Sequence, residues 1–226
     1  MNKIFLISFI FLLSISQSNS GQNQALMNSG KIVFEINYLD KNIDPKRKSM
    51  MPSQSILYFK GDKTRMELNM AIGNTVIISN NSTKKSTVLM DIFGNKIAME
   101  TTQEDAKKEM EKAGKLKVEK IAGSKMVAGY NCKKAKITQT NNGKDSSFDV
   151  WYTNEISVNN AASSGINGID GCMLEFQIFQ NGMRMQMTTK SITKQVVSES
   201  SFNIPDGYTF TTPEAIKSFM GGGFGK

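Results

Sequence analysis

Histidine is absent from the 226-residue sequence, which leaves two cysteines and many serines and lysines as possible reactive side chains. Without an imidazole, the chain has no Ser-His-Asp or Cys-His arrangement and lacks the usual general base near neutral pH. Cys132 and Cys172 are too few to form a zinc site from cysteine alone. A serine activated by a lysine is a third, weak option, because no spacing singles out such a pair. We therefore expect no enzyme, no cofactor and no metal.

The two cysteines are also candidates for a disulfide, which two cysteines in an exported protein favour. A bond between Cys132 and Cys172 would close a loop of about forty residues, worth ~4 kcal/mol in the chain-entropy model. The alternation of side chains argues against the bond, because Cys172 falls on an apolar side with Leu174 whereas Cys132 shares its side with Lys134. A bulge would correct this mismatch; otherwise the cysteines are two separate small hydrophobes.

The N-terminus has the three parts of a secretory signal peptide. Lys3 supplies the positive charge, residues 4–15 are almost wholly apolar, and the small residues Ser18 and Ser20 fit a cleavage site. The apolar run is too short to span a bilayer of about 30 Å. A signal peptide over residues 1–20 is therefore favoured over a buried strand or a tail anchor. We expect a protein that is exported to the periplasm or the extracellular space and is not membrane-spanning.

The sequence is basic, with a formal net charge of +8 and a pI of about 9.4. Excess positive charge can favour nucleic acid, acidic proteins or anionic lipid. The lysines are spread along nearly every expected strand and turn, which is more typical of a solubility feature. A nucleic-acid reader would concentrate its basic residues and place aromatic residues among them, so we expect no nucleic-acid partner.

Polar and apolar side chains alternate along short segments separated by Gly and Asn turns, which is the pattern of half-buried strands. Strands in sequence order form a meander that can close into a curved sheet. After a polar leader over 21–30, the sequence predicts one domain over 31–212. Its expected strands are 32–38, 56–60, 64–70, 75–79, 86–93, 96–100, 116–121, several between 127 and 178, 183–188 and 196–202.

Three segments depart from this pattern. Residues 103–115 carry acids early, lysines late and a narrow apolar stripe, which predicts a short helix that is either a surface crossover or a movable lid. Residues 40–52 are expected to form a mobile loop, and 213–226 a short helix with a flexible Gly-rich tail. The predicted fold class is mainly β: a strongly curved antiparallel sheet or incomplete β-barrel with one or two helices at its mouth.

Methionine is frequent, with fifteen residues, and several lie on the apolar side of expected strands. Flexible, polarizable thioethers adapt to variable shapes, which suits a site for acyl chains. The alternative is an ordinary core. The candidate ligand-binding residues are Phe34, Met66, Leu68, Met70, Met90, Met99, Phe176, Met183, Met185 and Met187.

Two further features could contact a partner. Trp151, the only tryptophan, alternates with Val150 and Tyr152, so it could face outward as part of an interface or pack under a helix. The long polar loop over 157–170 could gate a mouth or meet a partner. A flexible connection without a role is the simpler interpretation of this loop.

Three segments resemble secreted proteins of the lipoprotein-carrier (LolA/LolB-type) superfamily, close to the GLPGLI group. They are 127–135 (VAGYNCKKA), 150–156 (VWYTNEI) and 171–176 (GCMLEF). The chain departs from the GLPGLI string, because residues 168–174 read GIDGCML. The resemblance implies an incomplete antiparallel barrel with helices across its mouth and an apolar hollow for acyl chains.

The leading hypothesis is therefore non-catalytic binding of a lipid or lipoprotein acyl chain in the hollow of a curved sheet. The alternative is a cell-envelope interaction or structural module, bound to another envelope protein, whose core is filled by its own side chains.

Overall fold

The computed structural model describes residues 26–102, 104–105, 114–141, 143–158, 160, 166, 168–180 and 183–212. The expected signal peptide over 1–20, most of the expected helix over 103–115 and the expected C-terminal helix and tail over 213–226 lie outside these residues.

Twelve strands form one sheet in the order β12-β6-β5-β4-β3-β2-β1-β11-β10-β9-β8-β7. Within the described residues, neighbouring strands pair in antiparallel orientation except β12 with β6. The strands are β1 (Ser29–Tyr38), β2 (Gln54–Lys60), β3 (Lys63–Met70), β4 (Gly73–Asn80), β5 (Lys85–Ile92), β6 (Asn95–Thr102), β7 (Lys115–Val127), β8 (Tyr130–Asn141), β9 (Lys144–Thr153), β10 (Cys172–Gln180), β11 (Met183–Lys194) and β12 (Thr209–Phe210).

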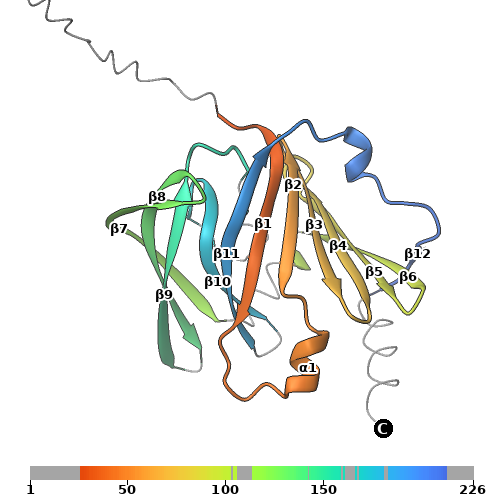
Figure 1. Ribbon diagram of the computed structural model, residues 1–226, viewed down its shortest axis with the longest axis horizontal. Coiled ribbons are helices and arrows are strands. Elements are labelled where there is room, and N and C mark those ends of the chain that lie inside the picture. The colour runs from red at the N-terminus through yellow and green to blue at the C-terminus, as the bar shows by residue number, and fades with distance from the viewer. Residues whose placement is uncertain are drawn as a thin grey trace, which may run out of the picture.

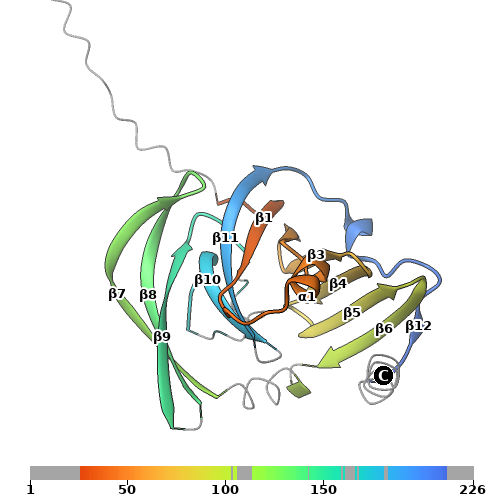
Figure 2. The ribbon, with the colours of Figure 1, turned by 60° about the horizontal axis from the view of Figure 1, so that its bottom comes forward.

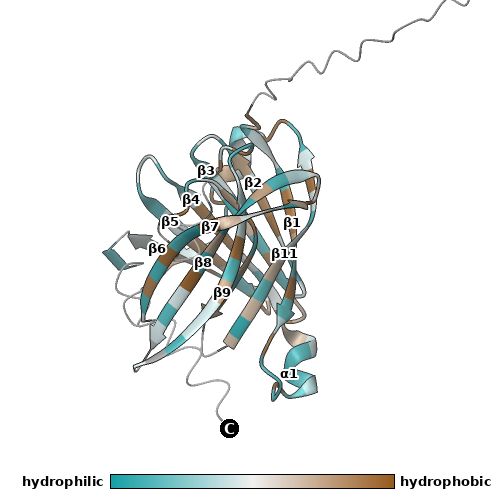
Figure 3. Ribbon diagram, turned by 90° about the vertical axis from the view of Figure 1, so that its left-hand side faces the viewer, coloured by the Kyte–Doolittle hydropathy of each residue, from teal (hydrophilic) through white to brown (hydrophobic). Residues whose placement is uncertain are grey.

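The sheet is curved and does not close, with β7 and β12 at opposite sides of the molecule (Figure 1). Seen from below, β7, β8 and β9 bend round one side while β3 to β6 extend on the other (Figure 2). The predicted fold class, mainly β with a curved antiparallel sheet, is confirmed. The alternation of polar and apolar residues that predicted it is visible as teal and brown bands along β7 to β9 (Figure 3).

Close approach of two strands explains why glycine is required at one position of the β4–β5 hairpin. Gly73 has a φ of +146°, and a Cβ at this position would lie 1.9 Å from the carbonyl oxygen of Asp91 on β5. Glycine has no Cβ and tolerates this conformation. The absence of a side chain therefore lets β4 and β5 pair over their full length, with Gly73 at the start of β4 opposite Ile92 at the end of β5.

The expected mobile loop over 40–52 is partly wrong, because it contains the helix α1 (Pro45–Met50). Proline at the first helical position is pre-organised for a helix. The Asp44 carboxylate caps the helix by accepting a hydrogen bond from the Arg47 backbone N–H at 3.0 Å. No residue of α1 is buried, and the helix lies at one end of β1 and β2 (Figure 1).

The strand expected over 196–202 is also wrong. This segment contains the 3-10 helix η2 (Glu199–Phe202), and the Ser198 hydroxyl accepts a hydrogen bond from the Ser200 N–H at 3.3 Å. Serine side chains offer the backbone such local partners in place of a sheet ladder. A turn follows at Asp206 and Gly207.

The segment from η2 to β12 crosses the outside of the sheet and covers a small apolar cluster. Its Phe202, Ile204 and Tyr208 pack on buried side chains of β4, β5 and β6, namely Val76, Ile78, Leu89 and Ala98. The segment from η2 to β12 therefore covers apolar side chains on the outer face of β4 to β6.

The described part of the loop over 157–170 packs into the main core. Val158, Ile166 and Ile169 are each at most 2% exposed. The Asn160 amide donates to the Met173 carbonyl at 2.9 Å and accepts from the Met173 N–H at 2.8 Å, which imitates the pairing of a strand. The described residues thus differ from the simple flexible connection that the polar composition suggested.

Among the described residues, no helix combines the length and the hydropathy that a membrane-spanning helix requires.

Candidate ligand-binding face

The ten candidate ligand-binding residues all lie on one face of the sheet. Residues directly opposite each other on paired strands point to the same side, and the registers connect these residues from β10 through β11, β1, β2 and β3 to β6. We call this the inner face and define it as the face that carries Phe34 and Phe176. The sequence pattern alone placed each residue on the apolar side of its own strand, and the register brings those sides together.

The inner face of β3 to β6 is built from two neighbouring rows of side chains. One row runs Met66, Ile77, Val88 and Met99, and the other runs Leu68, Thr75, Met90 and Ile97. All eight side chains are half-buried. With Met70, which is also half-buried, this part of the sheet presents a continuous apolar surface that is rich in methionine.

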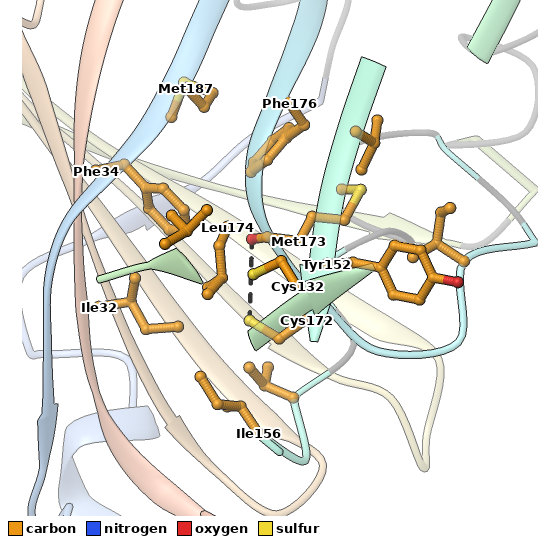
Figure 4. Packing of buried hydrophobic residues seen from close by; sticks show 14 of the residues in the cluster. Ile32, Phe34, Cys132, Tyr152, Ile156, Cys172, Met173, Leu174, Phe176 and Met187 are labelled. Atoms are coloured by element: carbon orange, nitrogen blue, oxygen red, sulfur yellow. Dashed lines mark hydrogen bonds between the residues drawn. The ribbon is translucent and has the colours of Figure 1, made fainter. Parts of the chain in front are cut away.

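The inner face of β1, β10 and β11 is different, because its side chains fill a closed core. Phe34, Phe176 and Met187 are at most 2% exposed. The rings of Phe34 and Phe176 meet edge to face, with centroids 5.7 Å apart and planes at 80°. Figure 4 shows Phe34, Leu174 and Phe176 directed toward one another. The candidate residues Phe34, Phe176 and Met187 therefore belong to the core. Met183 and Met185 at the start of β11 are half-buried.

Ser55 of β2 lies at the boundary of the two parts. Its neighbours on the paired strands are Phe34 of β1 and Leu68 of β3. Its side chain is fully buried, and its hydroxyl has no hydrogen-bond partner within the described residues. An unpaired buried hydroxyl is unfavourable, since it has given up its hydrogen bonds to water. The Ser55 hydroxyl is thus a polar group between the apolar side chains of Phe34 and Leu68 on the inner face.

The two cysteines are buried free thiols, so the disulfide considered above is not formed here. Cys132 lies on β8 and Cys172 on β10, with β9 paired between them. One strand thus separates the two backbone segments, and both side chains lie in the same buried cluster (Figure 4). Burial is the main cause that raises the pKa of the Cys132 thiol to about 11, and it raises the pKa of Cys172 further. Neither thiol is therefore a ready nucleophile near neutral pH.

Trp151 faces the outside, as its alternation with Val150 and Tyr152 suggested. It is half-buried, and the ammonium groups of Lys125 and Lys134 lie 4.6 and 5.5 Å from its ring centroid. Such contacts are favourable because the ring face is electron-rich. The Lys125 ammonium also pairs with the Glu175 carboxylate at 2.6 Å. The tryptophan is therefore packed between lysines on the sheet and does not lie under a helix within the described residues.

Two kinds of residue on the molecule were missed by the sequence reasoning. Ile77, Val88 and Ile97 complete the apolar rows, and the alternation within their strands was the available signal. A group of lysines around a surface pocket of about 480 Å³ was also missed, because a bulge in β7 between Ile121 and Ser124 shifts the pairing of β7 with β8.

The family model described as "Domain of unknown function (DUF4412)" matches residues 42–164, more than half of the 226 residues. The matched stretch runs from just before α1 to the loop after β9, so it includes the half-buried methionine surface of β3 to β6. No curated protein matches the chain.

Proposed function

The chain belongs to the DUF4412 family, and we propose that it is an exported, non-catalytic protein that binds a lipid or acyl chain. The observation that carries the proposal is the surface of half-buried side chains on the inner face of β3 to β6. Five of the ten candidate residues belong to it: Met66, Leu68, Met70, Met90 and Met99.

The chemistry of this surface suits a flexible apolar ligand. Large contiguous apolar patches usually mark interaction sites. Within the two rows only Thr75 carries a polar side chain. Methionine side chains repack at low cost, so the same surface can accommodate acyl chains of different length. Covering it would remove apolar area from water, which contributes roughly 25 cal/mol for each Å² buried.

Two sequence features support the rest of the proposal. The resemblance to the LolA/LolB-type superfamily in residues 127–135, 150–156 and 171–176 suggests the same use of a curved sheet. The expected signal peptide over 1–20 supports export to the periplasm or beyond. Export can be tested by the mass of the protein recovered from its own cells, which should start at Gly21.

The absence of catalysis is part of the proposal. It is supported by the lack of histidine in the sequence and by the burial of both thiols. Likeness of fold would not decide activity in either direction.

The decisive experiment is native mass spectrometry of the protein purified from its own envelope, followed by titration of the delipidated protein with a fluorescent fatty acid. We expect co-purified lipid and saturable binding. The double variant Met66→Gln/Met99→Gln places two amides on the inner rows and should weaken binding about tenfold, since burying an amide without a partner costs about 1–3 kcal/mol.

The matched control is Met126→Gln. Met126 is 65% exposed on β7, away from the rows, so its substitution should leave fatty-acid affinity unchanged. Recovery of no lipid together with no binding of added fatty acid would contradict the proposal. That result would favour the envelope interaction or structural module, for which the filled core around Phe34 and Phe176 is the supporting observation.

A further inference from the structure

The strands β7 and β8 hold most of the excess positive charge of the protein. Residues 115–141 contain seven lysines and one acidic residue, Glu119, which gives a net charge of +6, compared with +8 for the whole sequence. The lysines are Lys115, Lys117, Lys120, Lys125, Lys133, Lys134 and Lys136. These two strands are directly paired at one edge of the described sheet, so their pairing gathers these lysines in one region.

A bulge in β7 creates a depression within this basic region. The register passes from Ile121 opposite Lys134 directly to Ser124 opposite Lys133, so Ala122 and Gly123 have no partner residue on β8. Bulges bend a strand and redirect its side chains, and they are frequent at sheet edges and next to functional sites. Gly123 has a φ of +146°, and a Cβ there would lie 3.3 Å from the side chain of Lys134.

The depression is a pocket of about 480 Å³, within the usual size of small-molecule sites. Three lysines line it, Lys120, Lys133 and Lys134, and the single acidic residue of its lining is Asp170. The remaining polar lining comes from Tyr152 and Asn154. Lys134 Nζ also forms an ion pair with the Asp149 carboxylate at 2.7 Å, so part of its charge is balanced from outside the lining.

The partners of these lysines leave the pocket rich in donors. Lys133 Nζ donates to the neutral amide oxygen of Asn154 at 2.9 Å, so its charge is not balanced by that contact. Lys120 Nζ pairs with Asp170 at 2.7 Å, but the Asp170 side chain is 80% exposed and an exposed ion pair is weak. An ammonium group has three N–H donors, so each lysine can donate a hydrogen bond to a second partner.

We propose that this pocket binds a phosphate group, either free or carried on a larger molecule such as a lipid. A phosphate has several acceptor oxygens and up to two negative charges, which suit a pocket lined by lysines from both β7 and β8. The volume leaves room for part of the molecule that carries the phosphate. The inference does not depend on the methionine rows of β3 to β6, because the pocket is lined mainly by residues of β7, β8 and β9 at the other end of the strand order.

The test is calorimetric titration of the full mature chain with inorganic phosphate at low ionic strength, and sedimentation with vesicles. Vesicles of phosphatidylcholine with phosphatidic acid carry the group on a lipid, and vesicles of phosphatidylcholine alone do not. The double variant Lys120→Gln/Lys133→Gln should weaken binding about tenfold or more, as expected for loss of charged hydrogen bonds.

The control is Lys117→Gln/Lys136→Gln, which removes the same charge from the same two strands outside the pocket lining. It should change binding about twofold or less, as expected for exposed charges. Retention of the wild-type circular dichroism spectrum shows that each variant is folded. The Met66→Gln/Met99→Gln variant should bind phosphate normally, which separates this test from that of the proposed function.

Each outcome decides the proposal. Phosphate binding that is lost only in the pocket variant supports it with free phosphate as ligand. Vesicle binding that is lost only in the pocket variant supports it with a phospholipid headgroup as the source. Equal loss in both variants indicates diffuse attraction to the basic strands and overturns the proposal, as does failure to bind either probe.

Discussion

Leu57 of β2 stands directly opposite Met66 of β3, and the boundary between the closed core and the open apolar surface runs between them. Both side chains point to the inner face, but Leu57 is 2% exposed whereas Met66 is half-buried. Neighbouring strands of one sheet thus use the same kind of side chain for two purposes. On β2 the apolar residue contributes to stability, and on β3 it is exposed to a ligand or to solvent.

Leu57→Ala should therefore destabilise the protein much more than Met66→Ala. A fully buried leucine replaced by alanine leaves a cavity and typically costs about 2–5 kcal/mol. Met66 loses contacts on only part of its surface, so we expect a cost of about 1 kcal/mol. Urea unfolding followed by circular dichroism measures both. Equal destabilisation would mean that the inner face of β3 is as tightly packed as that of β2.

Ser55→Ala should stabilise the protein, by about 1 kcal/mol, because it removes a buried hydroxyl that has no partner within the described residues. The comparison is Thr189→Val, which removes the hydroxyl that donates to the Leu174 carbonyl at 2.7 Å. That variant should destabilise by about 1 kcal/mol. A loss of stability in Ser55→Ala similar to that in Thr189→Val would show that Ser55 has a partner in solution.

Gly73→Ala should be among the most damaging single substitutions. The added Cβ would lie 1.9 Å from the Asp91 carbonyl oxygen on the paired strand, so the β4–β5 hairpin would have to move. We expect a loss above about 3 kcal/mol. Gly94→Ala is the control, since Gly94 also has a positive φ, of +81°, but no atom lies within 4 Å of a Cβ there. It should cost about 1–2 kcal/mol for the backbone conformation alone.

The buried thiols should make stability fall at high pH. Burial raises the pKa of Cys132 to about 11 and that of Cys172 further, so both remain neutral in the folded protein where an unfolded thiol ionises. Their contribution is fully present below the unfolded pKa of about 8.5 and is lost as the pH rises through the folded values.

Urea midpoints measured between pH 8 and pH 11 should therefore fall more steeply for the wild-type protein than for Cys132→Ala/Cys172→Ala. The variant is the necessary reference, because lysines and tyrosines titrate in the same range. Parallel pH profiles would contradict the burial of the thiols. Slow reaction of the native protein with a thiol reagent at pH 8, and fast reaction in urea, is the expected independent result.

The strands were predictable because alternation is a local property that each segment displays by itself. The pattern over 64–70 places Met66, Leu68 and Met70 on one side, and β3 has this arrangement. Two local predictions failed for local reasons: Asp44 and Pro45 start a helix where a loop was expected, and Ser198 turns the chain where a strand was expected. Short polar side chains act on the backbone, which a pattern based on hydrophobicity does not include.

The amino-acid sequence alone determined that this chain forms a curved antiparallel sheet with one apolar side on each strand, and it excluded chemistry that requires histidine. Only the tertiary structure decided which apolar side chains are enclosed and which remain half-buried, because burial depends on the strands and loops that pack over each position. It also decided that Lys120 and Lys133 line one pocket, since their approach depends on the bulge and on the pairing of β7 with β8. Register and coverage are non-local properties, and no single segment of the chain carries them.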